Sequence, residues 1–345
     1  MAPAVRPAGE RTVTGTHDDA VDRALDALSL PRHDLGGLPD SPGRFPDGAP
    51  FRFEIPSTEG PECLDAVLEQ AAALDVPIHR VSQGSGVFML TDDELGRMAT
   101  RAASASVEVS LFARPCAAWG PSASARAPGG AALRSAAWGQ EQIRFAAQDV
   151  LRAADHGFRS VLIADLGLLT VFDQMKLAGD LPPDMQAKVS VMLPAANPAA
   201  ARAIERLGAG TLNVPSDLSL AQIAAIRAAV GIPLDVYVEA PDDLGGFVRF
   251  HEVPELIRVA APVHVKLGLR NAPDLYPSGA HLGATAVAMS RERVRRARLV
   301  LELVDRSGTG VRPSGHRPEG LAVPVPPEPA GMPGTRFPGA GSGLG

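Results

Sequence analysis

The strongest constraint on the fold is an alternation of short apolar runs with longer amphipathic runs, which repeats eight times between residues 51 and 306. Runs rich in β-branched and apolar residues predict strands, and the runs between them have helical periodicity. Strands that alternate with helices are typical of a parallel sheet joined by crossover helices. The predicted strands are 51–57, 77–84, 107–115, 160–167, 187–194, 211–216, 233–241 and 263–269.

Eight such units in about 250 residues predict a (β/α)8 barrel, the TIM-barrel fold of the α/β class. An open doubly wound sheet is the alternative, but its diagnostic G-x-G-x-x-G does not follow the first strand. We predict a tail over 1–50 with one short helix and a Pro/Gly-rich linker, the barrel over 51–308, and a disordered Pro/Gly-rich tail over 309–345. We expect neither tail to pack much against the barrel.

Composition and charge exclude several classes of protein. Lys and Arg number 33 against 39 Asp and Glu, so the chain lacks the basic excess that supports nucleic-acid binding. Two cysteines, Cys63 and Cys116, are too few for a disulfide framework, an iron–sulfur cluster or a Cys-based zinc site. Charged residues interrupt the first 30 residues, and no later stretch resembles a membrane span. These observations predict a cytoplasmic protein with no membrane or nucleic-acid partner and leave an oligomer open.

The predicted barrel interior is rich in charge. Because side chains alternate along a strand, Arg52 and Glu54 of the first strand and His264 and Lys266 of the eighth should face inward. Buried charges cost several kcal/mol each unless they are paired, so these residues form either a satisfied network or a site. Residues early in their strands are predicted to form structural ion pairs: Arg52, Glu108, Lys188, Asp235 and His264.

Candidate catalytic residues lie late in their strands, since barrel enzymes place their chemistry at the carboxyl ends. Strands seven, eight and one are neighbours about 4.8 Å apart in a closed barrel. Glu239, Lys266 and Glu54 should therefore stand side by side and perform acid–base chemistry, with Lys266 as an electrostatic clamp or proton donor. A structural Glu-Lys-Glu bridge is the alternative.

Further late-strand and loop residues are candidates for substrate binding. Arg270 and Asn271 follow the eighth strand, where many barrels bind a phosphate or carboxylate, so we expect a small anionic substrate. The long loop 116–140 should cover this face, and Gly245-Gly246 suits a hinged lid. The predicted substrate-binding residues are Gln83, Arg114, Asp165, Asn213, Arg270 and Asn271.

The sequence predicts no cofactor. Glu54, Asp165, Glu239 and His264 offer ligands for a divalent metal, but no H-x-H, H-E-x-x-H or D-x-D spacing supports a metal site, which stays the alternative. Cys116 has no nearby His and is predicted to be a small buried side chain rather than a nucleophile.

Six segments carry a resemblance to a known family: FRFEIPSTEGPE, HRVSQGSGV, VSLFARP, NVPSDLSLAQIAAIRAAV, PLDVYVEAPDDLGGFVR and KLGLRNAPDLYPSG. Over about residues 51–305 the chain resembles actinobacterial TIM-barrel proteins labelled U32 family peptidases. It lacks the Cys-bearing signature of the U32 peptidase and tRNA-hydroxylation relatives. The resemblance implies a TIM-barrel enzyme, by label a hydrolase.

Together these observations lead us to expect an enzyme, a hydrolase, lyase or isomerase, that uses acid–base chemistry on a small anionic or carbonyl-bearing substrate. A non-catalytic barrel that binds a ligand or partner is the alternative.

Overall fold

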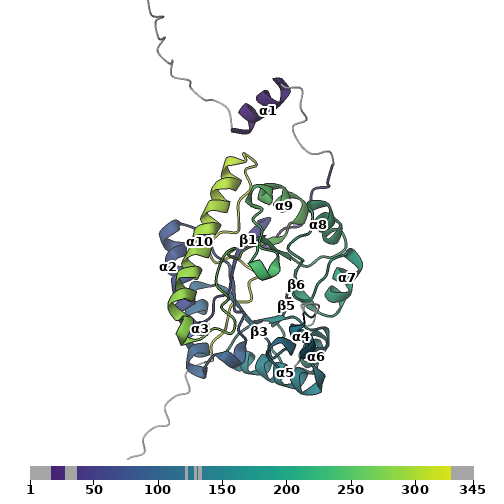
Figure 1. The fold of residues 1–345 in the computed structure, drawn as a ribbon, viewed down its shortest axis with the longest axis vertical. Helices are drawn as coiled ribbons and strands as arrows, with labels where there is room; N and C mark the ends of the chain where they lie inside the picture. The colour runs from purple at the N-terminus through teal and green to yellow at the C-terminus, as the bar shows by residue number, and fades with distance from the viewer. Residues whose placement is uncertain (1–16, 28–36, 121–122, 128–129, 131–133, 328–345) are drawn as a thin grey trace, which may run out of the picture.

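The structure is a computed structural model that describes residues 17–27, 37–120, 123–127, 130 and 134–327. Eight parallel strands pair in sequence order, and β8 returns to pair with β1, so the sheet closes into a barrel (Figure 1). The predicted (β/α)8 fold is confirmed. The strands are β1 (Phe51–Pro56), β2 (Arg80–Ser82), β3 (Glu108–Phe112), β4 (Ser160–Ile163), β5 (Gln186–Val189), β6 (Ala209–Asn213), β7 (Leu234–Glu239) and β8 (Val263–Leu267).

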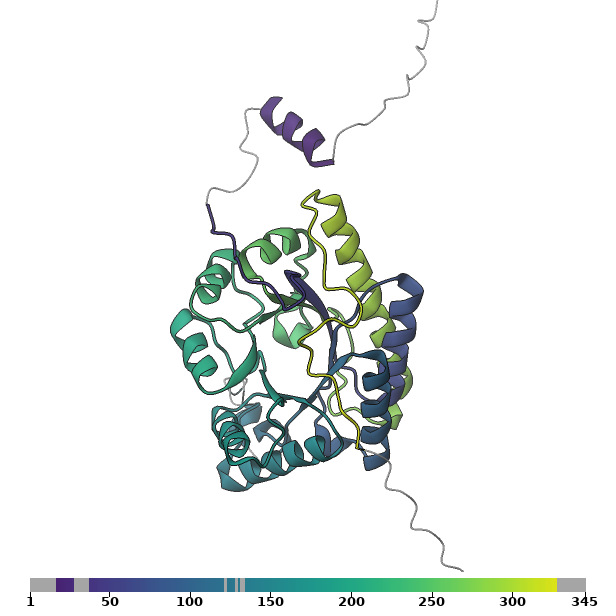
Figure 2. The same cartoon turned by 180° about the vertical axis from the view of Figure 1, so that it is seen from behind.

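Helices surround the barrel in both views (Figures 1 and 2). The long ones are α2 (Pro61–Leu74), α3 (Asp92–Ala105), α5 (Gly139–Asp155), α6 (Leu166–Ala178), α7 (Pro198–Arg206), α8 (Leu220–Arg227), α9 (Val253–Ala260) and α10 (Gly283–Arg306). Short helices lie in the loops: η1 (Val87–Met89), η2 (Ala117–Trp119), α4 (Ala123–Arg126), η4 (Asp242–Leu244), η5 (Phe250–Glu252) and η6 (Ala280–Leu282). The predicted N-terminal helix is α1 (His17–Ala27). Within the described ranges, no helix has the length and apolar character that a membrane crossing requires.

The apolar core lies between the strands and the helices. Val263, Val265 and Leu267 of β8 are fully buried in it, as alternation predicts for the outward face of a barrel strand. Local signals set the helix ends. Thr91 caps α3 and Ser219 caps α8 in a capping box: the cap side chain accepts from the backbone N–H three residues on, and that residue's side chain accepts from the backbone N–H of the cap.

A network of ion pairs fills the inside of the barrel toward the amino ends of the strands. The Lys188 ammonium lies 2.9 Å from the Glu54 carboxylate and also contacts that of Asp235. The Arg80 guanidinium lies 3.0 Å from the Asp235 carboxylate and 2.7 Å from that of Glu108. All five side chains are almost fully buried. The prediction that Glu108, Lys188 and Asp235 form structural ion pairs is therefore confirmed, and Glu54 belongs to the same network.

Pairing keeps the buried carboxylates ionised. Burial alone would raise the pKa of Glu54, but Lys188 and Lys266 outweigh it and lower that pKa to about 2. Burial acts in the same direction on Asp235, and the cations Lys188 and Arg80 hold its pKa well below the ordinary value. Burial also lowers the pKa of His264 to about 4, so this imidazole is neutral at pH 7.

The N-terminal linker differs from the sequence prediction, because residues 37–50 pack on the barrel. The Ser41 backbone N–H donates to the Arg258 carbonyl at 2.8 Å, and Arg258 donates to the Leu38 carbonyl at 2.7 Å. Phe45 is buried beneath the guanidinium of Arg52, which lies 4.1 Å from its ring centroid. A linker rich in Pro and Gly is therefore anchored by a few well-placed contacts.

The C-terminal prediction is wrong for residues 309–327, which we call the C-terminal segment. This segment crosses the barrel at the amino ends of the strands (Figure 2). Ser314 N–H donates to the Phe51 carbonyl at 3.0 Å, and Ser314 Oγ accepts from Arg52 at 2.9 Å. Arg52 also donates to the Glu319 carbonyl at 2.5 Å, and Ala322 N–H donates to Glu108 at 3.2 Å.

This packing arises because the amino ends of the barrel strands, which we call the floor of the barrel, carry buried charged groups that need hydrogen-bond partners. A segment without a core of its own can supply them through its backbone, which composition alone does not reveal. Residues 1–16, 28–36 and 328–345 of the predicted tails lie outside the described residues.

Candidate functional site

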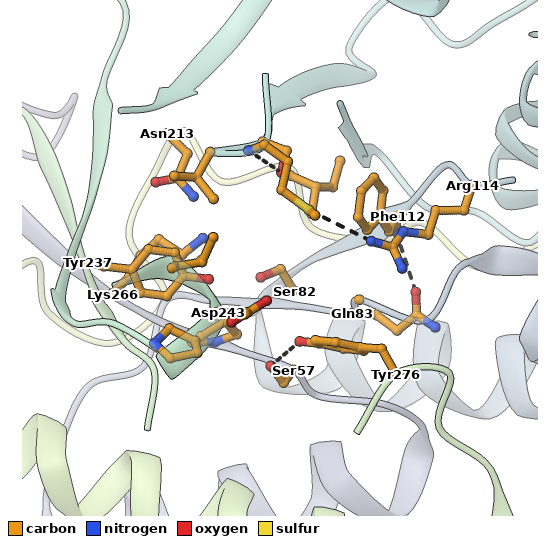
Figure 3. A pocket seen from close by; sticks show the side chains of 18 residues that line it. Ser57, Ser82, Gln83, Phe112, Arg114, Asn213, Tyr237, Asp243, Lys266 and Tyr276 are labelled. Carbon is orange, nitrogen blue, oxygen red and sulfur yellow. Dashed lines mark hydrogen bonds between the residues drawn. The ribbon is translucent and has the colours of Figure 1, made fainter. Parts of the chain in front are cut away.

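A pocket opens above the ion-pair network, at the carboxyl ends of the strands (Figure 3). It encloses about 590 Å³ of space, including its opening to solvent. We call it the mouth pocket. Its charged lining residues are Arg114, Asp243 and Lys266. This is the face where barrel enzymes carry their chemistry.

Lys266 stands on one wall of the mouth pocket, at the end of β8 (Figure 3). Its ammonium lies 3.3 Å from the Glu54 carboxylate and 4.3 Å from the centroid of the Tyr237 ring. The side-chain oxygen of Asn213 accepts from Lys266 at 2.8 Å when its amide nitrogen donates to the Asp235 carbonyl. The predicted neighbourhood of Lys266 and Glu54 is confirmed, and Lys266 joins the network below to the pocket above.

Arg114 stands on the opposite wall (Figure 3). Its guanidinium carbon lies 4.4 Å from the centroid of the Phe112 ring and 4.2 Å from that of the Trp119 ring. One terminal nitrogen donates to the Met192 sulfur at 3.7 Å, and the other N–H groups can bind a planar anion. The side chain is only 6% exposed, its Nε has no hydrogen-bond partner, and no carboxylate of the described residues lies within 4.0 Å. Burial lowers its pKa.

The β8–α10 loop brings Tyr276 over the mouth pocket, where its hydroxyl hydrogen-bonds Ser57. The ring fits because residue 84 is glycine: a Cβ at Gly84 would lie 2.3 Å from the ring. Burial raises the pKa of Tyr276, so its hydroxyl stays protonated. Gln83 also lines the pocket, but both ends of its amide bond the Gly86 backbone at 3.0 Å, so it shapes the turn after β2.

Asp243 belongs to η4, in the loop that follows β7, and lines the rim of the mouth pocket. Asp243 keeps an exposed surface; partial desolvation and the neighbouring Asp274 raise the pKa of its carboxylate, and Arg134 opposes this shift. In the described part of the chain no cation lies within 4.0 Å of it. Sequence alternation missed Asp243 and Tyr276 because both lie in loops, where a two-residue period does not apply. The available signal for Asp243 was its place in the Gly-rich loop predicted to form a lid.

The predicted position of Glu239 beside Lys266 and Glu54 is wrong. The register between β7 and β8 shifts between Tyr237 and Glu239, which inserts a residue and breaks the two-residue alternation. Glu239 consequently points away from Lys266 and Glu54. Its carboxylate accepts from the Arg270 backbone N–H at 3.1 Å and lies 3.4 Å from Arg296 of α10.

Three predicted binding residues also lie elsewhere. Arg270 and Asn271 line an outer groove together with Glu239, because the loop turns away from the mouth pocket after β8. Asp165 caps α6, and its two oxygens accept from the N–H groups of Leu168 and Ala137, each at 2.9 Å. Of the predicted binding residues, Gln83, Arg114 and Asn213 line the mouth pocket with Lys266.

The metal alternative gains no support from this geometry. Asp165 and Glu239 do not converge on Glu54 and His264. Among the residues that the structure describes, no three His, Cys, Asp or Glu side chains are arranged to hold a metal ion. Cys63 and Cys116 are both buried free thiols, and burial raises the pKa of Cys63, so neither has the character of an activated nucleophile.

The fold and the site define a (β/α)8 barrel with a charged pocket at the carboxyl ends of its strands. The sequence profile of peptidase family U32 matches residues 135–240, less than half of the chain. This region runs from before α5 to the end of β7 and includes Asn213 and Tyr237 but not Arg114, Asp243 or Lys266. No curated protein matches the chain.

Several solved structures resemble this one. A U32 peptidase is 19% identical over 61% of this chain and 74% of its own, with a TM-score of 0.34. The carboxyl transferase domain of Rhizobium etli pyruvate carboxylase is 13% identical over 89% of this chain and 53% of its own, with a TM-score of 0.44. A Rubisco from Hyperthermus butylicus is 12% identical over 76% and 63%, with a TM-score of 0.40. At these values the similarities carry no information about chemistry.

Proposed function

We propose that the chain is an enzyme related to peptidase family U32 that performs acid–base chemistry on a small, anionic, carbonyl-bearing molecule in the mouth pocket. One observation carries the proposal: the buried guanidinium of Arg114 has no carboxylate partner within 4.0 Å among the described residues and faces the same cavity as Lys266. The partial family match supports the relation to U32 proteins.

Arg114 provides the anion-binding position. A buried guanidinium without a counter-ion loses hydration that one weak contact with the Met192 sulfur, at 3.7 Å, replaces only in part, so a carboxylate or phosphate ligand would be favoured there. The nearby rings of Phe112 and Trp119 and the Met192 sulfur restrict the orientation of its N–H groups. These contacts would therefore orient a bound anion as well as help to bind it.

Lys266 provides the polarising group. Glu54 and Asn213 hold its ammonium at one end of the cavity, where it can donate a hydrogen bond to a carbonyl oxygen. As negative charge develops on that oxygen, Lys266 stabilises it and can transfer a proton to it. This chemistry assists either addition of water to the carbonyl or cleavage of a neighbouring bond, so hydrolase and lyase reactions are both supported.

A non-catalytic ligand-binding barrel is the second candidate, and one observation favours it. The Lys266 ammonium already has Glu54, Asn213 and the Tyr237 ring as partners, so the network is satisfied without a reaction.

A metabolite mixture incubated with the enzyme and followed by mass spectrometry tests the proposal. We expect consumption of a small carbonyl-bearing anion by the wild type. Lys266→Met should bind that anion and fail to convert it. Arg114→Gln should bind it about ten- to hundredfold more weakly, which corresponds to one lost charge-assisted hydrogen bond. Arg270→Gln is the matched control, since Arg270 lies in the outer groove. Binding without turnover in the wild type would favour the second candidate.

A further inference from the structure

The mouth pocket carries one charged group that the proposed chemistry does not use. We infer that Asp243 binds a protonated amine, so that the ligand of the mouth pocket is a zwitterion with a carboxylate on Arg114 and an ammonium on Asp243. This inference deepens the proposed function and rests on it.

The argument begins with the charges that line the cavity. Lys266 is already paired with Glu54 at 3.3 Å. Arg114 and Asp243 have no oppositely charged partner within 4.0 Å among the described residues, and they do not pair with each other. The wall thus presents one unpaired cation and one unpaired anion to the same space. A ligand that carries both charges pairs with both groups at once, whereas a simple anion pairs only with Arg114.

The two groups are near enough to act on one small molecule. Burial lowers the pKa of Arg114, and Asp243 is among the negative groups that oppose this shift, so the carboxylate lies within electrostatic range of the guanidinium. Both line one pocket of about 590 Å³. Because the charges are more than 4.0 Å apart, the amine and the carboxylate of the ligand should stand at opposite ends of a short chain.

The surroundings of Asp243 set the orientation of the ligand. A second cavity, lined by Arg134 and Arg293 as well as by Asp243 and Asp274, adjoins the mouth pocket at Ser57 and Tyr276. Asp243 is exposed at this edge, whereas Arg114 is buried in the pocket wall. Partial desolvation and Asp274 raise the pKa of Asp243, and a bound ammonium would relieve that repulsion. The carboxylate should enter first, with the amine left near the rim.

Matched ligand pairs test the inference. The probes are 4-aminobutyrate against butyrate and 6-aminohexanoate against hexanoate, each titrated into the full-length protein by calorimetry or ligand-observed NMR. In the wild type we expect the amino member of at least one pair to bind about tenfold more tightly, as one charge-assisted contact provides. Asp243→Asn should bring that ratio close to one without changing the affinity for the plain carboxylate.

Asp242→Asn is the matched control, because it makes the same charge change one residue away, on a side chain that accepts from the Asn271 backbone N–H and does not line the mouth pocket. It should keep the tenfold preference. Equal or weaker binding of the amino member in both pairs would overturn the inference while Arg114-dependent carboxylate binding upholds the proposed function. Absence of carboxylate binding, or binding unaffected by Arg114→Gln, would overturn both.

Discussion

Replacement of Asp149 by Asn should stabilise the protein above neutral pH and leave it unchanged in acid. Asp149 lies on α5 and is 8% exposed, and one of its carboxylate oxygens has no hydrogen-bond partner. Burial raises its pKa to about 7, while the Phe88 backbone N–H and the nearby Arg152 oppose the shift only in part. An ionised Asp149 is therefore a buried charge whose loss of hydration is only partly compensated.

The magnitude and sign follow from proton linkage. The pKa of this carboxyl rises from 3.8 to about 7 on folding, and one pKa unit corresponds to about 1.4 kcal/mol. Between these pH values the folded state keeps a proton that the unfolded state releases, so the contribution of Asp149 to stability falls as pH rises. Above pH 7 the ionised Asp149 lowers the free energy of unfolding by its full amount, for which about 4 kcal/mol is the upper bound.

Urea unfolding of the wild type and of Asp149→Asn at a series of pH values from 4 to 8 measures this effect. The difference in unfolding free energy should grow from pH 4 to about pH 7 and then level off, because other titrating groups cancel in the comparison. Asp155→Asn, on an exposed position of the same helix, should give a nearly constant difference. Parallel pH profiles for the wild type and Asp149→Asn, or a less stable Asp149→Asn at pH 8, would refute the reasoning.

Four further predictions concern the floor of the barrel, its mouth and the outer groove. A chain that ends after residue 308 should melt at a markedly lower temperature than the full chain, because Arg52 loses its partners in the C-terminal segment. A chain that ends after residue 327 keeps these partners and should melt like the full chain. Equal melting temperatures for the two shortened chains would contradict this. Glu54→Gln leaves two buried ammonium groups short of an anion and should cost about 3–5 kcal/mol in denaturant unfolding, with a loss below about 1 kcal/mol counting against the network. Gly84→Ala should displace Tyr276 and weaken ligand binding, and unchanged affinity would contradict this. Glu239→Gln should leave turnover unchanged, and a loss of turnover would restore Glu239 to the site.

Local sequence patterns were enough to predict the barrel. Apolar runs such as VHVKLGL fix both the strand and its outward face, and the alternation then places His264 and Lys266 inside. The same rule predicts the contact of Lys266 with Glu54, since neighbouring strands bring equivalent positions together. Helical crossovers need no long-range information beyond this pairing.

The positions of the remaining site residues could not be predicted from the alternation of side chains along a strand. One extra residue in β7 turns Glu239 outward, and no local pattern marks a bulge of this kind. Asp243 and Tyr276 reach the pocket from loops, so their positions depend on how those loops pack. Asp165 is a helix cap, a role its position before an apolar helix allows from the sequence alone.

The C-terminal segment has a consequence for how the chain folds during synthesis. Arg52 belongs to the first strand of the barrel, and its partner Ser314 follows 262 residues later. The floor of the barrel therefore stays open to water until all eight strands have left the ribosome, and the charges around Arg52 and Glu108 are solvated during that time. Contacts this distant in sequence form late and slow the final step of folding. We therefore expect a chain that stops before residue 309 to leave the charged groups at the amino ends of its strands exposed, which should make it more susceptible to proteolysis than the full chain.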